Sequence, residues 1–74
     1  MEILKNYTYT YEGIYCTFYN YVYIVKISDD LYCVSHVCKI KSNYTDEISE
    51  KVFSEVFVNY LDAYNCMLTR IRKS

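Results

Sequence analysis

Three residues of types that bind zinc lie close together in one segment of the sequence. They are Cys33, His36 and Cys38, and either Cys16 or Cys66 would supply a fourth ligand. Common structural zinc sites pair their ligands at short knuckle spacings, and that spacing is missing here. On a continuous strand, Cys33 would also point away from the other two ligands. The sequence therefore favours free cysteines that pack as small hydrophobic side chains, with no bound metal.

The other polar residues do not form a recognisable catalytic pattern. With one histidine and one glycine, the chain has no glycine-rich phosphate loop, and it contains no nucleophile elbow. Glu47, Glu50, Glu55 and Asp62 are spaced like the solvated face of a helix and form no motif-placed carboxylate pair. We therefore expect a protein that is not an enzyme and has no cofactor.

Tyrosine dominates the sequence, and its positions follow a two-residue period. Of the eleven tyrosines, seven fall on odd-numbered positions of one N-terminal stretch: Tyr7, Tyr9, Tyr11, Tyr15, Tyr19, Tyr21 and Tyr23. Because side chains two apart on a strand share a face, a hairpin in suitable register would gather these rings into one wall. Tyrosine is also enriched at the centres of protein contacts. The pattern predicts a partner-binding surface formed by Tyr7, Tyr9, Tyr15, Tyr19, Tyr21 and Tyr23.

The tyrosine pattern is also compatible with a purely structural role and with nucleic-acid binding. Tyrosine is a good strand former, and its rings can pack on one another across strands, at about 0.2 to 1 kcal/mol per pair. Aromatic platforms also stack the bases of single-stranded nucleic acid, usually among Lys and Arg side chains. Lys5 and Lys26 are the only cations in the first two predicted strands, and the net charge is −1. Nucleic-acid binding is therefore the weaker alternative.

Alternating apolar residues predict three strands, at about 3–11, 14–27 and 31–41, in an antiparallel sheet. We expect a three-residue first turn with Gly13 in the left-handed conformation, because a left-handed Glu12 is unfavourable and a right-handed one is not. This register pairs Tyr9 with Tyr15 and keeps the tyrosines on one face. A two-residue turn would instead pair Tyr11 with Ile14 and divide the tyrosines between two faces.

A helix is predicted at about 46–72. Thr45 followed by Asp46 and Glu47 is a typical helix start, with a hydroxyl cap and acidic residues in the first turn. From there apolar residues recur at steps of four and three: Phe53, Phe57, Tyr60, Tyr64, Met67 and Ile71. A helix of this length would extend beyond the sheet, so its tail would offer an oligomer contact made by Met67, Leu68 and Ile71.

These elements predict one α+β domain over residues 1–74, with β-β-β-α order and the helix packed on one face of a three-stranded antiparallel sheet. The other face of the sheet would stay uncovered. We therefore expect a protein-binding module that acts by steric occlusion, or else a purely structural homodimer. A cytoplasmic location is expected, because the chain shows no signal segment and no apolar run of about 20 residues.

In size and composition the chain resembles the accessory proteins of phages and other viruses that bind and disable a host protein, anti-CRISPR proteins among them. The resemblance lies in a short, tyrosine-rich and proline-free chain, and it includes no motif or aligned residue. It implies a cytoplasmic inhibitor of a host protein.

Overall fold

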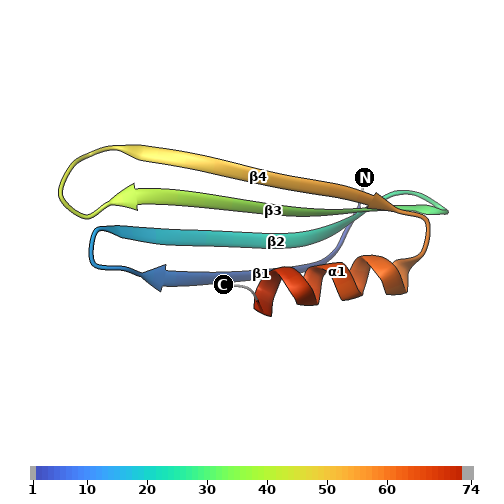
Figure 1. Cartoon of the computed structure of the whole chain (residues 1–74). Coiled ribbons are helices and arrows are strands. Elements are labelled where there is room, and N and C mark those ends of the chain that lie inside the picture. The colour runs from blue at the N-terminus through green and yellow to red at the C-terminus, as the bar shows by residue number, and fades with distance from the viewer. Residues whose placement is uncertain (1, 73–74) are drawn as a thin grey trace.

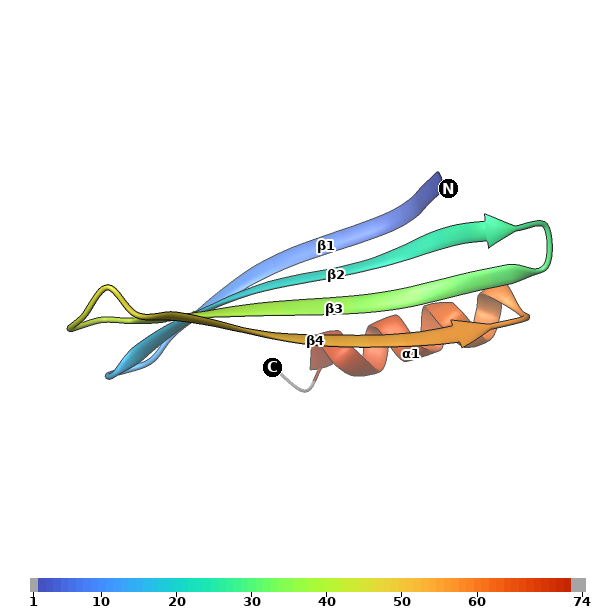
Figure 2. The same ribbon diagram turned by 90° about the horizontal axis from the view of Figure 1, so that it is seen from above.

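The computed structural model describes residues 2–72 as a four-stranded antiparallel sheet with one C-terminal helix. The elements are β1 (Glu2–Glu12), β2 (Cys16–Ser28), β3 (Leu31–Ser42), β4 (Ile48–Phe57) and α1 (Tyr60–Arg72). The strands lie in the order β1-β2-β3-β4, so each pairs with its neighbour in the sequence. Helix α1 folds back along one face of the sheet and covers only part of its length (Figures 1 and 2).

The α+β class, the antiparallel sheet and the C-terminal helix are confirmed, but the sheet has four strands where three were predicted. The first half of the predicted helix is strand β4. Phe53 and Phe57 are four residues apart, a spacing that fits both the helical period and the strand period of two. The branched side chains of Val52 and Val56 favour a strand, and β4 pairs with β3 along its whole length.

Helix α1 begins at a cap that was not predicted from the sequence. The Asn59 side-chain Oδ1 accepts a hydrogen bond from the Leu61 backbone N–H at 2.7 Å, the standard geometry of an asparagine N-cap. Asp62 lies in the first turn and Arg70 and Arg72 lie in the last, so the charges complement the helix dipole. Thr45, the predicted cap, instead lies in the β3–β4 turn, where its hydroxyl oxygen accepts from the Glu47 N–H at 3.2 Å.

Replacing Asn59 with alanine is expected to lower the free energy of unfolding by about 0.5–2 kcal/mol, because the Leu61 N–H loses its partner. Chemical denaturation measures this loss. The matched control is Asn65→Ala, an exposed position inside the same helix, where alanine should be neutral or slightly stabilising. Equal losses in the two variants would show that Asn59 does not cap α1.

The first turn differs from its predicted form. Glu12 pairs with Thr17, which leaves Gly13 to Cys16 as a four-residue connection, and the Gly13 N–H donates to the Cys16 carbonyl at 2.8 Å. Gly13 does not have a positive φ. Glycine is required at position 13 because the backbone of Cys16 comes very close: a Cβ on residue 13 would lie 2.9 Å from the Cys16 carbonyl oxygen.

This turn is held from outside by Asn43, in the β3–β4 connection. The Asn43 side-chain amide donates to the carbonyls of Gly13 at 2.9 Å and Ile14 at 3.2 Å, and its Oδ1 accepts from the Thr17 hydroxyl at 2.8 Å. With an even number of residues in the connection, the tyrosines of β1 pair with even-numbered residues of β2. The tyrosines of the two strands, which are all odd-numbered, therefore point to opposite faces, as they would with a two-residue turn. The prediction that the tyrosines share one face is therefore wrong.

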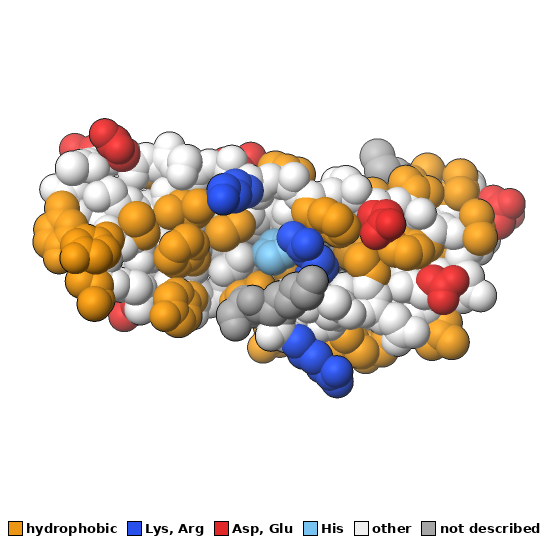
Figure 3. Space-filling model, in the orientation of Figure 1, with side chains coloured by type: hydrophobic (Ala, Val, Ile, Leu, Met, Phe, Trp, Pro, Cys, Tyr) orange, Lys and Arg blue, Asp and Glu red, His pale blue; other side chains and the backbone are white. Residues whose placement is uncertain are grey.

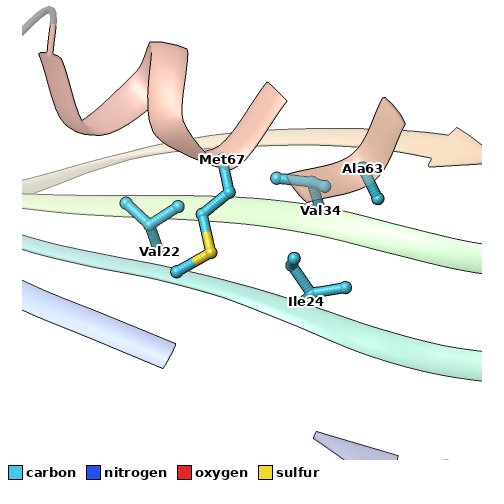
Figure 4. Close-up of a cluster of buried hydrophobic side chains, with 5 residues drawn as sticks. All are labelled: Val22, Ile24, Val34, Ala63 and Met67. Atoms are coloured by element: carbon cyan, nitrogen blue, oxygen red, sulfur yellow. The ribbon is translucent and has the colours of Figure 1, made fainter. Parts of the chain in front are cut away.

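The hydrophobic core is small and lies between α1 and the two central strands. Its fully buried members are Val22 and Ile24 from β2, Val34 from β3, and Ala63 and Met67 from α1 (Figure 4). Around it pack the half-buried side chains of Tyr9, Tyr32, Phe57, Tyr60, Tyr64, Cys66 and Ile71. Met67 was expected at an overhanging helix tail, but because α1 is short this side chain lies in the core.

Candidate protein-contact surface

The strand register assigns the side chains of the sheet to two faces. The helix face carries Val22, Ile24 and Val34 and is partly covered by α1. The opposite face, which we call the open face, is covered by none of the described elements (Figures 1 and 2). Its side chains are Ile3, Asn6, Thr8 and Thr10 of β1, Thr17, Tyr19, Tyr21, Tyr23 and Val25 of β2, Cys33, Ser35, Val37, Lys39 and Lys41 of β3, and Ile48, Glu50, Val52, Ser54 and Val56 of β4.

Apolar and aromatic side chains occupy most of the open face. Tyr21, Val37 and Val52 stand side by side in one row across the three strands from β2 to β4. Tyr21 is 40% exposed and Val52 is 62% exposed. At the edge strands, Ile3 and Val56 are also more than half exposed. These residues are exposed apolar groups on both sides of the Ser35–Ser54 pair, and a partner could cover them together.

Polar groups occupy the middle and one end of the open face. Ser35 is buried between neighbouring strands, and its hydroxyl lies 3.2 Å from the Ser54 hydroxyl. Toward the β1–β2 turn, Lys39 is paired with Glu50, and Lys41 is in the next row of the same face. The apolar area is therefore bounded by charged side chains at one end only, like the polar rim of a protein interface.

The structure brings together only three of the six tyrosines predicted to bind a partner. Tyr19, Tyr21 and Tyr23 are neighbours on the open face. Tyr7 and Tyr9 lie on the helix face, opposite Val22 and Asn20, with ring centres 5.8 Å apart. Tyr15 lies in the β1–β2 turn, with its ring centre 6.3 Å from that of Tyr44.

A polar chain on the helix face, beside the last turn of α1, was not predicted. Arg70 Nε donates to His36 Nδ1 at 3.2 Å, and His36 Nε2 lies 2.9 Å from Asn20 Oδ1. A guanidinium only donates, so Nδ1 is the acceptor and Nε2 carries the proton that reaches Asn20. Burial, and then the Arg70 charge, lower the pKa of His36 from its usual value. One sequence signal for this polar chain was available: Asn20 is a polar residue at a position of β2 where the alternation calls for an apolar one.

The lowered pKa of His36 predicts that the protein is less stable in acid. The unfolded chain, with a histidine pKa of about 6.5, binds a proton more readily than the folded chain. Stability from this group is therefore complete above about pH 6.5 and is lost as the pH falls from there toward the folded pKa. Urea unfolding at about pH 8 and about pH 5.5 measures the loss. His36→Gln should remove this part of the pH dependence; an equal loss in that variant would contradict the assignment.

The cysteines do not form a metal cluster. Cys33 is on the open face, whereas His36 and Cys38 are on the helix face. Within residues 2–72, no three His, Cys, Asp or Glu side chains are grouped so that they could hold a metal ion. Burial, together with the Glu55 carboxylate beside it, raises the pKa of the Cys66 thiol, which keeps this thiol protonated and weakly nucleophilic. In the same part of the chain, α1 does not have the length and apolar character needed to cross a bilayer.

No protein-family model, no curated protein and no solved structure matches this chain. The fold and the surface define its class: a small α+β protein with a four-stranded sheet. A helix partly covers one face of this sheet, and the other face is open.

Proposed function

We propose that this chain is a non-enzymatic protein-binding module whose contact surface is the open face of the sheet. The observation that supports this proposal is the uncovered row of Tyr21, Val37 and Val52 together with the neighbouring Tyr19 and Tyr23. Apolar patches of several hundred Å² on a monomer usually mark an interaction site. Tyrosine supports such a contact because it offers a broad apolar ring and a hydroxyl with few rotatable bonds.

The size of the sheet is suited to a specific protein interface. The molecule measures 45 by 21 Å in its two longer dimensions, so its outline has an area of roughly 900 Å². This is an upper limit for one face of the sheet, and it is close to the about 800 Å² that each partner contributes to a standard interface. A peptide or a small ligand would cover only part of this area. A folded protein with a flat surface would cover most of it.

The open face also specifies the chemistry of its partner. The partner surface should be flat and apolar where it meets Tyr21, Val37 and Val52, and it should offer hydrogen-bond acceptors or donors to the tyrosine hydroxyls. It should carry both charge signs at the end where Lys39 and Glu50 lie. Binding by a whole sheet face would act by steric occlusion, the activity implied by the resemblance to viral inhibitors of host proteins.

A second copy of the chain is the other candidate partner. If two open faces pack about a two-fold axis parallel to the strands, the row containing Tyr21 meets the same row of the other copy, and apolar groups cover apolar groups. Among residues 2–72, the core has five buried hydrophobic residues, and small domains commonly gain stability by association. Sedimentation velocity of the purified chain distinguishes the candidates: a dimer at micromolar concentration supports self-association, and a monomer supports a different protein.

The test of the contact surface is a charge placed on the open face. Val52→Lys introduces a cation into the apolar row at an exposed position, so it should leave the fold intact while abolishing partner binding or dimer formation. The matched control is Val58→Lys, because Val58 is 75% exposed and lies between β4 and α1, outside the sheet. Loss of binding in the first variant alone supports the open face; equal effects in both variants contradict it.

A further inference from the structure

A pocket lies on the part of the helix face that α1 leaves uncovered. It has a volume of about 580 Å³, within the range of about 300–1,000 Å³ usual for small-molecule sites. Its walls include the rings of Tyr11, Phe18 and Phe53. Figure 3 shows apolar side chains gathered on one side of the histidine on this face, with blue cationic side chains next to it.

The polar groups of this pocket are mostly donors. Arg70 and Lys51 line it, and no acidic side chain does so among the described residues. Arg70 lies over the Phe53 ring, with its guanidinium carbon 4.0 Å from the ring centre, and uses Nε to bond His36. Its terminal N–H groups are therefore held in place but carry no bond to a described side chain.

One further polar group at the pocket lacks a partner. The Tyr9 hydroxyl is buried and has no hydrogen-bond partner within residues 2–72. Asn20, which also lines the pocket, is 6% exposed, and its Oδ1 is engaged by His36. A buried polar group without a partner costs about 1–3 kcal/mol, so a bound acceptor at this position would be favoured. Cationic and amide donors together with aromatic walls match a flat apolar molecule that bears an oxyanion.

We infer that this pocket binds a small organic anion, with its planar body against Phe18 and Phe53 and its carboxylate or phosphate group at Arg70, Lys51 and the Asn20 amide. This site lies mainly on the opposite side of the sheet from the open face, so it adds a second function to the proposed one; Val52 on the edge strand β4 borders both surfaces.

The test is an NMR titration of the isotope-labelled full chain with 2-naphthoate. Its matched probe is 2-naphthamide, which has the same shape without the charge. We expect 2-naphthoate to bind with a Kd of about 1 mM, to shift the resonances of Phe18, His36 and Phe53, and to bind about tenfold more tightly than the amide. A second pair of titrations, with AMP and with its neutral analogue adenosine, repeats the comparison for a phosphate group. A preference for either anion over its neutral analogue at these residues supports the proposal and identifies the oxyanion.

Variants separate this pocket from general charge effects. Lys51→Gln removes an exposed cation at the pocket and should weaken 2-naphthoate binding about threefold to tenfold. Lys39→Gln removes an exposed cation from the open face and should leave the Kd unchanged. The proposal is overturned if the acid and the amide bind equally, if the shifts lie at Tyr21 and Val37, if Lys39→Gln weakens binding as much as Lys51→Gln, or if neither anion binds up to its solubility limit.

Discussion

Replacing Ile24 with alanine is expected to remove about 2–5 kcal/mol of folding free energy. Ile24 is completely buried between the sheet and α1, and it contacts a core that has only four other fully buried members. Removing its outer carbons leaves a cavity that the pleated strands cannot close. Domains of this kind have about 5–15 kcal/mol of stability in total, and a chain this short lies near the lower limit. The variant should therefore be largely unfolded or close to its unfolding midpoint at room temperature.

Circular dichroism with urea titration measures this loss, and Ile27→Ala is the matched control. Ile27 lies near the end of the same strand and is 44% exposed, so its truncation should cost less than about 1 kcal/mol. A similar loss at both positions would show that α1 does not form the core that the structure places around Ile24.

The second large effect is expected on binding. Replacing both Tyr19 and Tyr21 with threonine should weaken partner binding by at least about 100-fold, because each interface tyrosine near the centre of a contact contributes about 2 kcal/mol or more. Threonine retains the strand propensity of tyrosine. The unfolding free energy should change by only about 1 kcal/mol, through lost cross-strand ring contacts. Affinity for the captured partner, or the dimer dissociation constant, is the quantity to measure.

The matched control for this double variant is Tyr44→Thr. Tyr44 is 72% exposed in the β3–β4 connection, so its loss should change neither binding nor stability. If the double variant unfolds, Tyr19 and Tyr21 are structural residues. If it folds and binds as the unmodified chain does, the open face is not the contact surface.

The sequence was sufficient for the features that depend on local alternation. The three strands up to residue 42 follow the two-residue period of their apolar residues, and their observed ends differ from the predicted ones by at most two positions. The uncovered second face also followed from the sequence, because the strands are apolar on both sides and one helix can cover only one of them.

The features that could not be predicted depend on contacts distant in the sequence. The first turn takes its four-residue form with the support of Asn43, about thirty positions away. Strand β4 forms because its backbone pairs with the otherwise free edge of β3. The four-residue spacing of Phe53 and Phe57 fits a helix and a strand equally well, so it could not reveal this strand. The polar chain of Asn20, His36 and Arg70 joins two strands and a helix. The Asn59 cap was a local signal, as was Asn20 within the apolar alternation of β2, but the assumed helix start at Thr45 concealed the cap.

The most direct test of the open face is the solvent accessibility of its methyl groups in the free chain. NMR relaxation by a soluble gadolinium chelate, recorded at a concentration where the chain is monomeric, reports this accessibility residue by residue. We predict strong relaxation at Val52 and Val56, and weak relaxation at Val22 and Val34. If the methyl groups of Val52 and Val56 are as protected as those of Val34, the second face is covered and the proposed contact surface does not exist.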